Sequence, residues 1–119
     1  MLDVKLIILF GSKASGFSGR NSDVDVAVLA DRPLSLSDKT FLIEDLIKKI
    51  ETTEDKIDLI DLWQAPPLLQ NEIAQSGKLL IGSEFDFLRF KVLAWKRYQD
   101  TKKLRRAREE NLETIVNVR

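Results

Sequence analysis

The chain has 119 residues, of which 44% are apolar and 32% charged, and its 19 basic residues balance 19 acidic ones. This size and composition are typical of one globular domain, and the balanced charge gives no general attraction to nucleic acid or an anionic membrane. Because cysteine and histidine are both absent, disulfides, thiolate nucleophiles, Cys/His zinc sites and histidine acid–base catalysis are excluded. Any resident metal must then be a hard cation bound by oxygen, such as Mg²⁺ or Mn²⁺.

The first third of the chain predicts two strands and a helix. Residues 4–10, VKLIILF, form an almost continuous apolar run, which is typical of a strand buried on both faces. The β-branched residues of 24–29, VDVAVL, predict a second strand. Ser35 or Ser37 can then cap a helix that runs to about Glu51.

The remaining two thirds predict two further strands and two helices. KIDLIDLW at 56–63 returns to strand composition, and the double proline after it opens a short helix that Gly77 ends. KLLIG at 78–82 predicts a short edge strand. A long C-terminal helix follows over about 84–113, where glycine and proline are absent.

This order of elements predicts an α/β (α+β) fold. We expect a single domain over residues 1–119, with a small mixed β-sheet covered by helices mainly on one side and a long C-terminal helix. The apolar run near the N-terminus has only seven residues and no cleavage signal after it. It predicts neither a membrane span nor a signal peptide, so a cytoplasmic location is expected.

The connection between the first two strands is unusually rich in small residues. Residues 11–22, GSKASGFSGRNS, contain three glycines and four serines. Loops of this composition between buried strands often place backbone N–H groups around an anion, although a plain surface loop has the same composition.

Two acidic residues stand at the start of the second strand. Side chains alternate along a strand, so Asp23 and Asp25 project from one face, where like charges repel unless a cation lies between them. A solvated strand edge would also tolerate such a pair. A third carboxylate is available on the next strand, at Asp58 or Asp61, and only one of the two can share the face of the metal site. Three carboxylates and a Gly/Ser loop are what metal-dependent phosphoryl or nucleotidyl transfer requires.

These residues resemble a known family. The pattern of Gly11-Ser12, ten residues, Asp23-x-Asp25 and a later strand acid is similar to the signature of the DNA polymerase β-type nucleotidyltransferases. The words LFGSKASG, SDVDVAVL and KIDLIDL resemble the minimal nucleotidyltransferases, and more narrowly the MntA-type antitoxins paired with HEPN-domain toxins. The resemblance covers residues 4–82 well and the C-terminal helix less well.

The resemblance implies an antitoxin that is a protein adenylyltransferase. It would transfer AMP from Mg²⁺–ATP to a tyrosine hydroxyl of a HEPN ribonuclease, with two metal ions, and form a hetero-oligomer with that toxin. Carried over by position, the phosphates would be held by Gly11 and Ser12. The metal ligands and catalytic carboxylates would be Asp23, Asp25 and Asp58. Asp58 is taken as the third acid because it aligns with the first acid of the family's motif on this strand.

The loop departs from the family pattern after the Gly-Ser pair. Family members often carry an aromatic residue or arginine where this chain has Lys13, and Ser15 stands where an arginine is frequent. Lys13 can supply positive charge to a phosphate or simply be solvated. Arg20, in the same loop, is a weaker candidate for that charge.

The C-terminal helix carries two further patterns. Its first half has apolar residues at helical spacing, namely Phe85, Leu88, Val92 and Trp95. Residues 102–108, KKLRRAR, contain five basic residues in seven. Such a run is usually a solvated face with local ion pairs, but the segment after Lys102 can also be a surface for a protein partner, and nothing in it reads bases.

Two other functions fit the same residues. One is a catalytically silent nucleotidyltransferase-like module that neutralises a partner by binding alone, although such a module has no need of clustered carboxylates. The other is a small-molecule nucleotidyltransferase of the antibiotic-modifying kind, for which a second subunit would have to complete the acceptor site.

Overall fold

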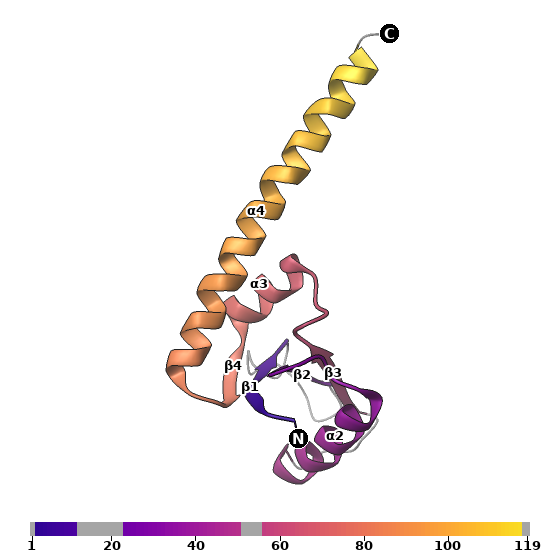
Figure 1. The fold of residues 1–119 in the computed structure, drawn as a ribbon. Coiled ribbons are helices and arrows are strands. Elements are labelled where there is room, and N and C mark those ends of the chain that lie inside the picture. Colours follow the sequence, from indigo (N-terminus) through magenta and orange to yellow (C-terminus); the bar gives the residue numbers. More distant parts are fainter. Residues whose placement is uncertain (1, 12–22, 51–55, 118–119) are drawn as a thin grey trace.

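The computed structural model describes residues 2–11, 23–50 and 56–117, and the side chains of 2–11, 23–49 and 56–110. A four-stranded sheet lies at its centre, in the order β3-β2-β1-β4. Figure 1 shows α2 on one side of this sheet and α3 with the start of α4 on the other. The elements are β1 (Val4–Phe10), β2 (Val24–Ala30), α2 (Leu36–Ile50), β3 (Ile57–Asp61), α3 (Pro67–Ser76), β4 (Lys78–Ile81) and α4 (Glu84–Asn117).

The sheet is mixed, as its sequence pattern predicts. β1 pairs antiparallel with β2 on one side and with β4 on the other, while β2 and β3 run parallel. The short strand β4 is at an edge of the sheet, as expected for residues 78–82. The double proline and Gly77 bound α3, which confirms the predicted limits of that helix.

The helices cover both faces of the sheet, so the expectation of helices mainly on one side is wrong. On one face, Val26 and Val28 pack against Leu42 and Leu46 of α2. On the other face, Leu6, Ile8 and Ala27 pack against residues of α3 and α4, including Ile73 and Phe90. The two-sided burial has a physical reason, because β1 and β2 are apolar at successive positions and cannot leave either face in water.

Helix α4 projects far beyond the sheet, and it gives the molecule a long axis of 60 Å. It packs on the body through Phe90 and Ala94, which are 6% and 0% exposed. In Figure 1 its second half extends past α3. The apolar residues that the helical spacing of the sequence identifies, Phe85, Leu88, Val92 and Trp95, lie elsewhere on the helix and are more than half exposed.

Helix α2 begins with a reciprocal pair of cap hydrogen bonds. The backbone N–H of Asp38 donates to Ser35 Oγ at 3.1 Å, and the backbone N–H of Ser35 donates to Asp38 Oδ2 at 2.9 Å. Arg32 adds an ion pair, with 2.7 Å between its Nη1 and Asp38 Oδ2. This arrangement is a capping box in which aspartate takes the place usually held by Glu or Gln. The hydrogen bonds from Arg32 and Ser35 lower the pKa of Asp38 to about 2.

None of the helices in the described ranges combines the length and the apolar character that crossing a bilayer requires.

We expect Asp38→Asn to lower the free energy of unfolding at pH 6 and to lose that effect in acid. Because the carboxyl has a pKa of about 2 when folded and about 3.9 when unfolded, its charged form stabilises the fold. That stabilisation is complete above the unfolded value and is lost as the pH falls through the folded one. Urea unfolding of both proteins at pH 6 and again near pH 2 measures the difference. If the free energies of unfolding of the two proteins differ by the same amount at both pH values, the charge of Asp38 does not stabilise the fold.

Candidate active site

Gly11 is the first residue after β1, and it lies against the carboxylate of Asp25. The last residue of β1, Phe10, pairs with Asp25 across the antiparallel ladder. Gly11 turns the chain out of the sheet with a φ of +71°, a conformation that L side chains rarely adopt. A Cβ at this position would overlap Oδ2 of Asp25. The turn therefore requires glycine both for its backbone conformation and for its closeness to the acid.

Asp25 and Asp58 lie side by side at one end of the sheet. They are register partners in the parallel pairing of β2 with β3, and neighbouring strands are about 4.8 Å apart. Asp25 alternates with Val24 and Val26, which face α2, so its carboxylate is on the opposite face. Asp58 alternates in the same way with Ile57, and it projects to the same face as Asp25. Asp23 is exposed and directly precedes β2.

Asp58 and Asp23 both lie within electrostatic reach of Asp25. Burial raises the pKa of the Asp25 carboxyl, and repulsion from Asp58 and then from Asp23 raises it further. Asp25 is thus half-buried beside two like charges, an arrangement that costs free energy when all three groups are ionised. A cation among them would remove that cost.

Asp61, the other candidate for the third acid, is on the opposite face and has a structural role. It is 5% exposed. Its Oδ2 accepts the backbone N–H of Leu34 at 2.9 Å, and its Oδ1 accepts that of Trp63 at 3.0 Å. The carboxylate thereby ties the segment before α2 to the turn that leaves β3. With both oxygens used in this way, Asp61 is not available to a site beside Asp25.

Part of the predicted site falls outside the described residues. Ser12, Lys13, Ser15 and Arg20 all belong to residues 12–22, which lie outside the described ranges. Within those ranges, no group of three acidic side chains stands close enough together to form a ready metal cage. The structure thus brings Gly11, Asp25 and Asp58 together and places Asp23 within electrostatic reach of Asp25.

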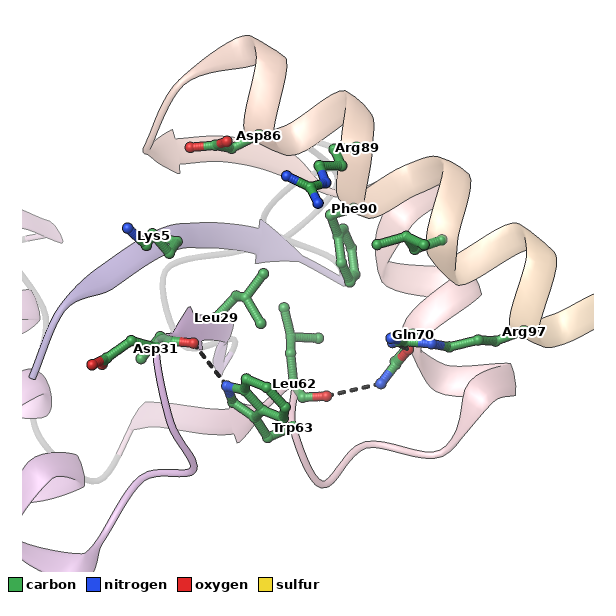
Figure 2. Close-up of a pocket in the computed structure, with 12 residues that line it drawn as sticks. Lys5, Leu29, Asp31, Leu62, Trp63, Gln70, Asp86, Arg89, Phe90 and Arg97 are labelled. Atoms are coloured by element: carbon green, nitrogen blue, oxygen red, sulfur yellow. Dashed lines mark hydrogen bonds between the residues drawn. The ribbon is translucent and has the colours of Figure 1, made fainter.

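A cavity of about 490 Å³ opens at the other end of the sheet, away from the acids. Figure 2 shows it between the ends of β2 and β3 and the first turns of α4, with Trp63 on one side and Arg89 and Arg97 on the other. The indole Nε1–H of Trp63 donates to the carbonyl of Ala30 at 2.7 Å. Phe90 contributes an apolar wall.

Buried Gln70 organises the α3 side of this cavity. Its amide Nε2 donates to the carbonyl of Leu62 at 2.8 Å, and its Oε1 accepts from Arg97 Nη1 at 3.3 Å. The sequence offered no signal for this cavity, because its lining comes from β1, β2, the turn after β3, α3 and α4. The cavity is at the wrong end of β2 to share a ligand with Asp25.

Comparison with known proteins gives a consistent set of relatives. A family model described as polymerase beta, nucleotidyltransferase, matches residues 2–86. The protein adenylyltransferase MntA of Aphanizomenon flos-aquae is 32% identical over an aligned length of 127 positions, and the alignment covers 95% of this chain and 81% of the relative. The protein adenylyltransferase MntA of Shewanella oneidensis is 35% identical over 104 residues, or 87% of this chain and 73% of the relative.

Two of the solved structures that resemble this chain are described as toxin–antitoxin structures. A crystal structure of a toxin–antitoxin with AMP-PNP has a TM-score of 0.75 at 32% identity, and covers 93% of this chain and 87% of that one. A structure of the tri-AMPylated Shewanella oneidensis HEPN toxin in complex with the MNT antitoxin has a TM-score of 0.68 at 29% identity. It covers 93% of this chain and 84% of that one.

We expect Gly11→Ala to destabilise the fold by about 1 kcal/mol or more and to weaken nucleotide binding. The new methyl group would overlap the Asp25 carboxylate and strain a positive φ. Urea unfolding measures the stability, and calorimetric titration with ATP and Mg²⁺ measures the binding. Glu44→Ala, at an exposed position of α2, is the control and should change neither quantity. Normal nucleotide binding by Gly11→Ala would show that the closeness of this turn to Asp25 is unimportant.

We expect alanine substitutions of the two acids of β3 to have different effects on the free energy of unfolding. Asp61→Ala removes the acceptor of two backbone N–H groups, one of them buried, and should lower the free energy of unfolding by about 3 kcal/mol. Asp58→Ala, at an exposed position, should change it by less than about 0.5 kcal/mol. Thermal or urea unfolding distinguishes the two. The same loss for both variants would mean that Asp58 also supports the fold.

Proposed function

The chain belongs to the polymerase β nucleotidyltransferase family, and from this premise we propose that it is an antitoxin that adenylylates its partner toxin. It transfers AMP from ATP to a tyrosine hydroxyl of a HEPN-domain ribonuclease and thereby silences the ribonuclease. One observation carries the proposal: the sheet register holds Asp25 beside Asp58 and against the Gly11 turn. The relatives named protein adenylyltransferase MntA and the complex that contains an AMPylated HEPN toxin support it.

The donor set suits Mg²⁺. The candidate ligands, Asp23, Asp25 and Asp58, are all carboxylates, the donors that a hard cation prefers. Burial raises the pKa of Asp25, and repulsion from Asp58 and Asp23 raises it further; a cation would relieve that repulsion. When bound, one or two Mg²⁺ ions would neutralise charge on the triphosphate and make the acceptor hydroxyl easier to deprotonate.

The protein's own groups then bind and orient the two reactants. The backbone N–H of Gly11 and the hydroxyl of Ser12 hold the terminal phosphates of ATP, since the glycine turn brings the end of β1 against Asp25 with no side chain between them. Asp58 is exposed at the sheet edge, where it can accept the proton of an incoming tyrosine.

The transfer balances as a single displacement at the α-phosphorus. The tyrosine oxygen forms a bond to that phosphorus while the bond to the bridging oxygen of the β-phosphate breaks. Diphosphate leaves with the bonding electrons, and the proton of the hydroxyl passes to a carboxylate and then to solvent. The products are the tyrosyl adenylate and diphosphate, with no oxidant or reductant involved.

We expect transfer of labelled AMP to the cognate HEPN toxin to depend on the carboxylates. Asp23→Ala, Asp25→Ala and Asp58→Ala should each reduce the rate by at least about a hundredfold, since each removes a charge that positions the reacting phosphate. Incubation with Mg²⁺ and labelled ATP, followed by electrophoresis of the toxin, measures the label.

Two exposed acids elsewhere serve as controls for this experiment. Asp45 and Asp100 are on α2 and α4, and their alanine variants should transfer AMP at the normal rate. Absence of label with the unaltered chain, or undiminished transfer by the Asp23→Ala/Asp25→Ala double variant, would overturn the enzymatic proposal. A chelator should stop the reaction, and added Mg²⁺ should restore it.

A further inference from the structure

One line of side chains along α4 has the regular spacing of a helix–helix contact. The intervals between its members alternate between three and four residues, as in the seam of a coiled coil. We call this line the outer seam, and its members are Phe85, Leu88, Val92, Trp95, Gln99, Lys102 and Arg106.

The apolar half of the outer seam is not used by the fold. Its side chains Phe85, Leu88, Val92 and Trp95 are 72%, 60%, 57% and 54% exposed. Helix α4 packs on the body through a different line, which includes the buried residues 90 and 94. Four large apolar side chains in one exposed row on a charged helix are typical of a surface that binds another protein.

The basic half of the seam argues against parallel pairing with a second copy of the chain. In a parallel pair of α4 helices, each seam residue meets its own counterpart. Lys102 would then face Lys102, and Arg106 would face Arg106, within the contact itself. Like charges brought together in this way are destabilising, most of all where water is excluded.

Antiparallel pairing is no better suited to this seam. Overlap along its whole length would set Phe85 against Arg106 and Leu88 against Lys102, which buries cations without partners. Overlap of the apolar half alone would extend over ten residue steps, from Phe85 to Trp95, or about 15 Å of helix. A contact that short is well below the usual size of a stable interface.

We propose that the outer seam of α4 is the docking surface for the toxin, and that the toxin meets it with an apolar groove followed by a cluster of acidic side chains. The inference rests on the proposed function for the identity of the partner. The chemistry of that partner comes from the seam itself, which is apolar near the sheet and basic beyond it. From Phe85 to Arg106 the seam is about 32 Å long, enough to guide one partner helix.

The decisive experiment measures binding without transfer. The Asp23→Ala/Asp25→Ala chain is used as the background, and its Kd for the purified cognate HEPN toxin is determined by calorimetry or interferometry. Leu88→Glu/Trp95→Glu should raise Kd by at least about tenfold, because aromatic anchors dominate interfaces and the new carboxylates would be buried without partners in an apolar groove. Leu104→Glu is the matched control, since Leu104 is 63% exposed on the opposite side of the same helix.

The basic half of the seam has its own matched pair. Lys102→Glu/Arg106→Glu should raise Kd by about fivefold or more and flatten the dependence of Kd on salt. Arg108→Glu, on the opposite side of the helix, should leave both nearly unchanged. Circular dichroism and urea unfolding of every variant check the fold, which substitutions outside the buried core should leave intact.

The outcomes separate this inference from the proposed function. Equal Kd values for seam and control variants, or no binding of the toxin at all, would overturn the docking surface. So would a homodimer in sedimentation that Leu88→Glu/Trp95→Glu converts to monomer. If the unaltered chain transfers AMP but the seam variants and the control variants have equal Kd values, the proposed activity stands and the docking surface is overturned. If the seam variants alone lose binding but the unaltered chain transfers no AMP, the docking surface stands and the proposed activity is overturned.

Discussion

The register of β2 between β1 and β3 is the constraint on which the candidate site depends. Successive β2 residues are buried against different layers, with Val26 facing α2 and Ala27 facing α3 and α4. A slip of one residue would turn Asp25 into the apolar layer beneath α2 and expose a valine. The core thus holds Asp25 in line with Phe10 and Asp58. The placement of the acids is a consequence of hydrophobic packing, because carboxylates alone would drive one another apart.

Much of this fold could be predicted from local chemistry. The apolar runs predicted the limits of the strands to within a few residues, and the double proline and Gly77 predicted those of α3. These residues restrict the backbone conformation at their own positions, so their effect is local. The layer assignment failed for a different reason. Whether a helix crosses above or below a sheet depends on the path of its connections, and no residue in α2 encodes that choice by itself.

The two acids of β3 and the apolar row of α4 show where pattern reaches its limit. Alternation required Asp58 and Asp61 to face opposite sides, but only the parallel pairing with β2 reveals which one adjoins Asp25. Helical spacing likewise found Phe85 and Trp95 on one side of α4. The spacing could not show that Phe90, on another side of α4, is the residue that packs against the sheet. A helix with two lines of apolar residues has two possible buried faces.

The long projection of α4 also bears on how the free chain survives. Residues 103–110 are all exposed, so the helix there is supported by hydrogen bonds and side-chain pairs of its own, and such helices are marginal in water. Transient unwinding presents a flexible, basic strand to proteases that cut after Lys and Arg. A partner that covers this stretch would hold it helical and shield it. The lifetime of the chain in a cell would then rise with occupancy of α4, and fall whenever it is made in excess of its partner.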